Sequence, residues 1–205
     1  MQTESNLRMP SSHPERETLE GKNKISGVWF FLGGECVLFA SLIGTFLGLR
    51  GSTAGGPTSQ DLFSFELVFI MTVFLLVSSL TSVLGVMAMQ RHDYARMQLW
   101  FGITVLLGLA FLACEIYEFV EYVHLGLGYT TSAFASAFYT LVGFHGAHVT
   151  FGVGWITALI VQARRQRSIN TINAPKFYVA SLYWHFIDVV WVFIFTIVYL
   201  MGMVD

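Results

Sequence analysis

The ionisable residues of this chain that could do chemistry lie inside long apolar runs. Glu35 stands in the middle of the apolar run 26–49, and later runs carry three pairs of polar residues at a spacing of three. That spacing puts both members of a pair on one face of a helix. The pairs are Glu115 with Glu118, His145 with His148, and His185 with Asp188. Because an ionisable group inside a membrane segment indicates a functional site, these seven residues are the candidates.

Carboxylates and histidines on several helices of a bundle can build a di-iron site, and paired histidines can bind haem. The helical rise argues against both. In an apolar core ~30 Å thick, Glu115 lies ~11 Å from the outer edge and His185 ~11 Å from the inner edge. About 8 Å of height therefore separates them. His145 and His148 share one segment, with His185 lower on another. We therefore predict no metal ligand, no cofactor-binding residue and no catalytic residue in this chain.

Glu35 has no Lys or Arg at its depth in any apolar run. Burial disfavours the charged carboxylate, so we predict that Glu35 is neutral or shares a proton with a polar neighbour. Its role stays open between a hydrogen bond that joins helices and a proton-linked or lipid-linked function. We expect Asp188 to accept the ring N–H of His185, and Glu115 to lie deeper than the hydrated carboxylates Glu118 and Glu121.

The elements that must position these groups are membrane-spanning helices. Of the 205 residues, 55% are hydrophobic and only 12% are charged. Five apolar segments reach the ~20 residues that a spanning helix needs, and none shows the alternation of a β-barrel strand. The predicted fold is all-α: a polytopic bundle of five transmembrane helices (26–205) behind a polar cytoplasmic tail (1–25). The predicted helices are 26–49, 64–90, 97–122, 132–162 and 178–203.

The basic residues predict the orientation of the bundle. Ten of the eleven Lys and Arg residues lie in the tail and in the second and fourth connections, and Arg50 alone lies in the first. The positive-inside rule therefore predicts a cytoplasmic N-terminus and a C-terminus outside. A net charge of −2 without a basic stripe disfavours nucleic acid as a partner. Five uninterrupted helices cannot form the two equal halves of a typical secondary transporter.

Three segments carry a resemblance to a known family. The segments 143–149 (GFHGAHV) and 183–191 (YWHFIDVVW) resemble the signature segments of subunit III of the haem-copper oxidases. Glu35, within 32–39 (LGGECVLF), resembles the buried glutamate of that family. The resemblance covers nearly the whole chain, from about Leu19 to Val204, in the five-helix bacterial form. Segments 18–24, 176–181 and 199–203 look most like the aa3/caa3-type cytochrome c oxidases of Gram-positive bacteria.

The resemblance implies a non-catalytic core subunit of a proton-pumping terminal oxidase in the bacterial cell membrane. It implies direct packing against subunit I, contact with subunit II and a small subunit IV, and bound phospholipid. Haem A and copper are then expected in the partner subunits. The resemblance also implies a supporting role in stability and proton uptake. Subunit III of a quinol oxidase shares the core motifs and stays open as an alternative, as does an independent lipid- or proton-handling membrane protein.

Overall fold

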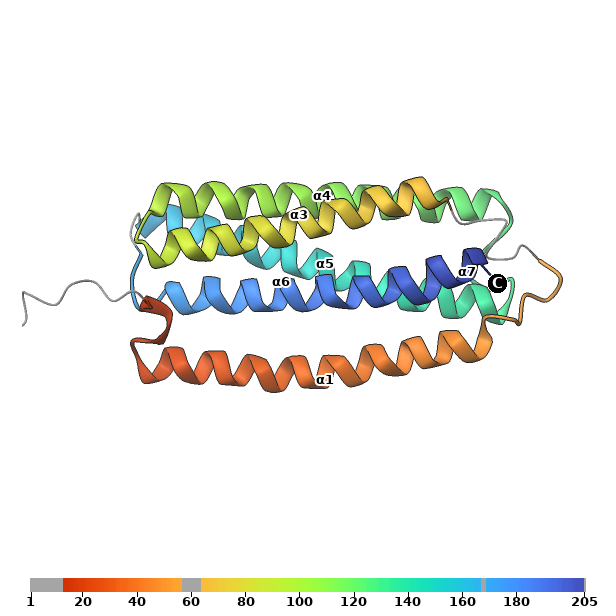
Figure 1. Ribbon diagram of the computed structural model, residues 1–205, viewed down its shortest axis with the longest axis horizontal. Coiled ribbons are helices and arrows are strands. Elements are labelled where there is room, and N and C mark those ends of the chain that lie inside the picture. The colour runs from red at the N-terminus through yellow and green to blue at the C-terminus, as the bar shows by residue number, and fades with distance from the viewer. Residues whose placement is uncertain (1–12, 57–63, 167–168, 205) are drawn as a thin grey trace, which may run out of the picture.

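The computed structural model describes residues 13–56, 64–166 and 169–204, so the first twelve residues of the predicted tail lie outside it. Five helices are long and apolar enough to cross a membrane, which confirms the predicted all-helical class (Figure 1). They are α1 (Leu19–Leu49), α3 (Phe65–Gln90), α4 (Tyr94–His124), α5 (Ala133–Gln166) and α6 (Ala174–Ile194). The last of these continues through η2 (Phe195–Leu200) into α7 (Met201–Val204).

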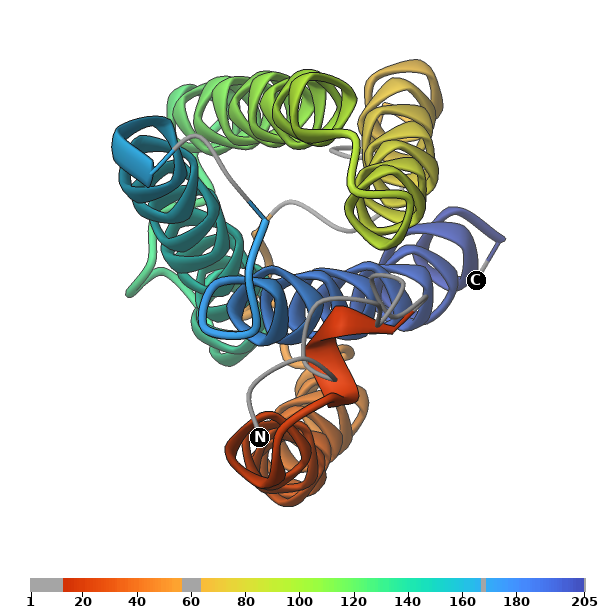
Figure 2. The ribbon, with the colours of Figure 1, turned by 90° about the vertical axis from the view of Figure 1, so that its left-hand side faces the viewer.

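Four of the helices form a closed ring, and the fifth lies outside it. Viewed from one end, α3, α4, α5 and α6 surround a common core in that order (Figure 2). Helix α1 packs on the outside of this ring, against α5 and α6. The described Lys and Arg residues apart from Arg50 gather at the end where α1 begins. The side of the membrane on which this end lies remains a prediction.

Large aromatic side chains fill the ring, and glycines make room for them. Trp184 on α6 is 1% exposed, and its indole packs against Gly108 of α4. A Cβ atom at Gly108 would lie only 2.6 Å from the Trp184 ring. The Trp184 Nε1 donates to Ser78 Oγ of α3 at 2.9 Å. Three helices therefore meet at one indole.

The first helix begins earlier than the sequence predicted. It starts at Leu19 rather than at residue 26, because the Thr18 hydroxyl accepts a hydrogen bond from the Gly21 amide and caps the helix. The short 3-10 helix η1 (Pro14–Arg16) precedes it and buries Glu15. Residues 14–25 are therefore ordered helix and turn rather than polar tail.

The last helix is also not the continuous α-helix that the sequence predicted for 178–203. It begins at Ala174, with Pro175 in its first turn, and six residues near its end form the wider π-helix η2. A proline is tolerated in the first turn because its missing N–H would have no intrahelical partner there. The π-helical segment carries Tyr199, which contacts a buried carboxyl described below.

Candidate functional site: the buried polar groups

Glu35 and His148 meet between α1 and α5, near the middle of both helices. The Glu35 Oε2 lies 3.1 Å from His148 Nε2, and each side chain is 16% exposed. The other ring nitrogen, Nδ1, lies 2.7 Å from the Phe144 carbonyl of its own helix. A carbonyl can only accept, so His148 Nδ1 carries a proton and donates.

The fixed role of Nδ1 determines the chemistry of the pair. If His148 is neutral, its Nε2 has only a lone pair, and Glu35 must be the protonated donor. If Glu35 is ionised, Nε2 must be protonated and His148 is a cation. Both cases place one proton between Oε2 and Nε2. The geometry therefore gives Glu35 a polar neighbour with which it can share a proton, and the sharing itself stays a prediction.

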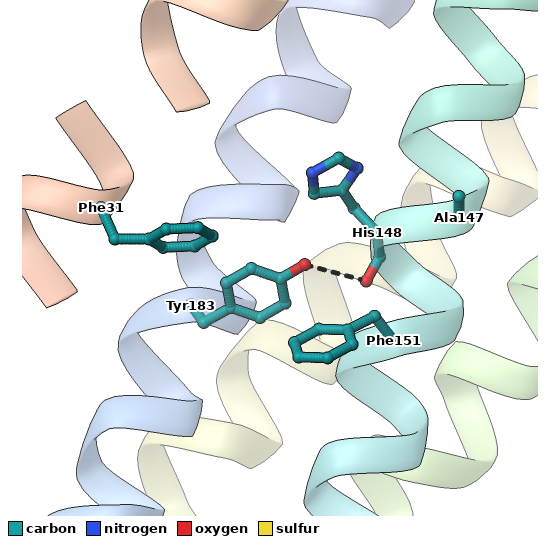
Figure 3. A pocket seen from close by; sticks show the side chains of 5 residues that line it. All are labelled: Phe31, Ala147, His148, Phe151 and Tyr183. Atoms are coloured by element: carbon teal, nitrogen blue, oxygen red, sulfur yellow. Dashed lines mark hydrogen bonds between the residues drawn. The ribbon is translucent and has the colours of Figure 1, made fainter. Parts of the chain in front are cut away.

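The pair borders an aromatic hollow of about 260 Å³ between α1, α5 and α6. Phe31, His148, Phe151 and Tyr183 line it, and their rings surround the space (Figure 3). The Tyr183 hydroxyl donates to the His148 backbone carbonyl at 3.2 Å. A second apolar groove of about 360 Å³ lies on the other side of α1, lined by residues that include Cys36 and His185. Apolar space thus flanks α1 on both sides.

Glu118 is held by two tyrosines. Its side chain is buried, with 0% exposure, and it accepts hydrogen bonds from Tyr122 and Tyr199, both at 2.8 Å. The prediction that Glu118 is hydrated was therefore wrong, whereas Glu121 is exposed. The i, i+3 spacing correctly placed Glu118 on the inner face of α4. It could not show that the π-helical segment would bring Tyr199 against that face.

Glu115 lies one turn earlier on α4 and faces α5 instead. It is 3% exposed, and its Oε1 is buried and has no hydrogen-bond partner within the part of the chain that the structure describes. Its carboxyl packs directly on Gly146, so that a Cβ atom there would overlap both carboxyl oxygens. Glu115 and Glu118 therefore share a helix face but have different neighbours.

His145 has a separate setting from His148. It is 0% exposed inside the ring, where its Nε2 lies 3.3 Å from the Ile187 carbonyl. Its ring packs against Phe111 and Trp191, with centroids 5.6 and 5.1 Å away. The spacing of three predicted a common face, but His145 points into the core and His148 towards α1.

His185 does not pair with Asp188, so that prediction was wrong. The His185 ring lies between two serines, with Nδ1 2.7 Å from Ser79 Oγ and Nε2 3.3 Å from Ser181 Oγ. Asp188 is 6% exposed, and among the described contacts neither of its carboxyl oxygens hydrogen-bonds to the His185 ring. Ser79 of α3 reaches the imidazole of His185 because α3 and α6 pack side by side.

Within the described ranges, no three His, Cys, Asp or Glu residues come together as a possible metal site. The structure instead adds polar partners that the sequence analysis did not single out. They are Tyr122 and Tyr199 at Glu118, and Ser79 and Ser181 at His185. Hydroxyl groups inside apolar helices were the available signal, since such groups often join transmembrane helices.

The comparison with known families identifies the chain. The family model described as cytochrome c oxidase subunit III matches residues 22–203. The chain belongs to this family. Subunit 3 of cytochrome c oxidase from Alkalihalophilus pseudofirmus is 66% identical over 192 residues, which cover 93% of each chain. The corresponding subunit from Bacillus sp. (strain PS3) is 65% identical over 192 residues, covering 93% of this chain and 92% of the relative.

A quinol oxidase relative is more distant. Quinol oxidase subunit 3 of Bacillus subtilis (strain 168) is 48% identical over 189 residues, which cover 92% of each chain. The chain is therefore a subunit III of the haem-copper oxidases, a multi-pass membrane protein that works in a complex with other oxidase subunits. The resemblance drawn from segments 143–149 and 183–191 is confirmed.

Proposed function

We propose that this chain supports subunit I of a proton-pumping cytochrome c oxidase in the bacterial plasma membrane. Subunits I and II would hold haem A and copper, and a small subunit IV would complete the complex. The identity of 66% to a cytochrome c oxidase subunit, against 48% to a quinol oxidase subunit, supports cytochrome c as the electron donor. Residues of this chain would stabilise the complex, bind lipid and help to supply protons to subunit I. The chain itself would carry out no redox step.

The arrangement of α1 supports the lipid-binding part of the proposal. Apolar grooves of about 260 and 360 Å³ flank this helix where it meets α5 and α6. Their lining is mainly aromatic and aliphatic, which suits acyl chains of phospholipids. Two large aromatic side chains of α1, Trp29 and Phe30, are 60% and 84% exposed, and Trp29 lines the larger of the two grooves.

The single observation that carries the proton-linked part is the contact between Glu35 and His148. A carboxyl and an imidazole that hold one proton between them can pass it on without moving either helix. Glu35 therefore has a role available to it beyond joining α1 to α5.

The identity of the electron donor is tested on the purified complex. Reduced cytochrome c and a quinol are supplied separately as electron sources. We expect rapid oxygen consumption with cytochrome c. If oxygen is consumed with the quinol but not with cytochrome c, the chain is a subunit of a quinol oxidase. A chain that leaves a mild-detergent column without haem-containing partners would overturn the proposal altogether.

The role of Glu35 is tested with Glu35→Ala and Glu35→Gln in the assembled oxidase. We expect Glu35→Ala to leave the haem spectrum intact and mainly to shorten the working life of the enzyme or slow its proton supply. Glu35→Gln keeps a hydrogen bond to His148 but cannot release a proton. A Glu35→Gln complex that behaves like the wild type would show that only packing matters. Complete loss of initial turnover in a fully assembled complex would contradict the supporting role.

A further inference from the structure

A groove on the outer face of the ring, between α4 and α5, holds a carboxyl oxygen for which the described part of the chain supplies no hydrogen-bond partner. The groove has a volume of about 480 Å³. Its lining includes Leu112, Ala113 and Ile116 of α4 and Gly143, Gly146 and Thr150 of α5. Glu115 forms its polar part. This groove lies apart from the hollow beside Glu35, which α1, α5 and α6 form.

The contrast between Glu115 and Glu118 shows what the groove lacks. Both carboxyls are more than nine-tenths buried and lie one turn apart on α4. Glu118 accepts two tyrosine hydrogen bonds, whereas among the described residues Glu115 Oε1 meets no hydrogen-bond partner. Buried polar groups in native proteins are nearly always hydrogen-bonded, so the carboxyl of Glu115, which lines the groove, is suited to a polar partner that enters the groove.

The depth of Glu115 excludes a lipid headgroup as that partner. Nine residues separate it from His124, the last residue of α4. At a rise of 1.5 Å per residue this is about 14 Å along the helix axis. Headgroups lie at the ends of such helices, and acyl chains at this depth have no polar atom to offer. Water is also unsuitable, because a buried water needs two to four polar partners and this groove is almost entirely apolar.

The small residues of the groove favour a helix as the occupant. Ala113, Gly143 and Gly146 lie among the larger side chains that line the groove. Transmembrane helices associate through such small residues, which let two backbones approach, and through polar side chains that hydrogen-bond across the contact. Gly146 has a second role here, because any larger residue would displace the Glu115 carboxyl.

We propose that the α4–α5 groove is the docking site for a transmembrane helix of another polypeptide of the oxidase complex. That helix presents a hydrogen-bonding side chain, such as Ser, Thr, Asn or Gln, to Glu115. This inference rests on the proposed function, because it requires that the chain work inside an oxidase complex. Beyond that function, it names the groove in which another helix binds, the depth of the contact and the hydrogen bond to Glu115.

The test is photo-cross-linking in the intact complex, with p-benzoylphenylalanine in place of Ile116. Ile116 is 64% exposed and borders the groove. We expect an adduct between this chain and an apolar membrane-spanning segment of another subunit that purifies with the haem-containing complex. Adducts with lipid or detergent alone, or with a second copy of this chain, would overturn the proposal.

Two leucine variants of α5 provide matched controls. Gly143→Leu adds a large side chain to the groove, and the nearest side-chain atom to its new Cβ, on Phe119, lies at an ordinary contact distance of 3.9 Å. Gly154→Leu makes the same change on the same helix, where nothing lies within 4 Å. The adduct should be lost in Gly143→Leu and kept in Gly154→Leu. An equal yield in both variants would refute the groove as the site.

The carboxyl is tested separately, and the haem content of every sample separates the two proposals. Glu115→Gln should keep the adduct, since an amide still hydrogen-bonds, and Glu115→Leu should lose it. An adduct that survives in Glu115→Leu would contradict the contact. If haem co-purifies but no adduct forms, this inference fails alone; if no haem co-purifies, the proposed function fails first.

Discussion

Removal of the Tyr199 hydroxyl tests how much one buried hydrogen bond contributes to the ring. Tyr199→Phe keeps the aromatic contacts with Phe138 and Trp191, whose ring centroids lie 6.2 and 6.0 Å away. It removes the hydroxyl that donates to Glu118 Oε2 at 2.8 Å. Glu118 retains Tyr122, whose hydroxyl donates to Oε1 at 2.8 Å. The variant therefore tests the hydrogen bond between η2 and α4.

The expected magnitude follows from where the bond lies. Hydrogen bonds between transmembrane helices contribute about 0.6 kcal/mol on average and up to about 1.7. Glu118 is fully buried, so we expect Tyr199→Phe to cost about 1 kcal/mol, a fall of about 3 °C in Tm. Tyr122→Phe combined with Tyr199→Phe leaves a buried carboxyl with neither donor and should cost about 3 kcal/mol, more than the sum of the single changes.

The stability of this chain is measured by heating the purified complex with a thiol-reactive fluorophore. Unfolding exposes Cys114, so the rate of its labelling reports the loss of structure. Cys114 is partly buried on α4, whereas Cys36 is exposed and is replaced by serine for the assay. Fluorescence of this chain is read after electrophoretic separation from its partners. Tyr117→Phe is the control, because Tyr117 is 60% exposed on the same helix. A double variant as stable as either single variant would refute the shared role of the two tyrosines.

Two glycine substitutions test close contacts elsewhere. Gly108→Ala should destabilise the ring by about 1–3 kcal/mol in the same thermal assay, because its new Cβ would lie 2.6 Å from the Trp184 ring. Gly102→Ala, with nothing within 4 Å of its new Cβ, should keep or slightly raise the stability, because alanine favours a helix more than glycine does; an equal loss of stability in Gly102→Ala would refute the steric explanation. Gly21→Ala would place its Cβ 2.5 Å from the Glu15 carbonyl oxygen, so it should release η1 and speed tryptic cleavage at the exposed Arg16. Unchanged cleavage in Gly21→Ala would show that η1 is held without this contact.

The sequence predicted the five helices and the candidate polar residues because both depend on local properties. Length and apolar composition are enough to identify a spanning helix, and a spacing of three is enough to place two residues on one face. Partners depend on tertiary packing. The imidazole of His185 meets Ser79, 106 positions away, rather than the nearby Asp188. No property of the segment around His185 could have shown which residue of α3 would lie opposite.

The helix ends were less predictable for a different reason. The prediction began α1 at residue 26, where the long apolar run starts, whereas the structure begins it at the cap formed by Thr18. Polar helical turns continue the helix beyond its apolar part, so composition underestimates its length. The π-helical segment η2 was also hidden, since its residues are as apolar as those of a regular helix. Only the contact between Tyr199 and Glu118 shows what the irregular backbone accomplishes.

The two kinds of contact in this chain respond differently to protons. Neutral donors join the ring, as in the bond from Trp184 to Ser78 and that from Trp191 to Thr72 at 3.0 Å. Helix α1 is joined midway by Glu35 and His148, whose contact needs a proton between Oε2 and Nε2. A second proton would leave an imidazolium N–H that still donates to a carboxyl oxygen. Loss of the only proton would set a carboxylate against a lone pair and turn attraction into repulsion. The seam between α1 and the ring can therefore gain a proton without opening, and it cannot lose its last one without weakening.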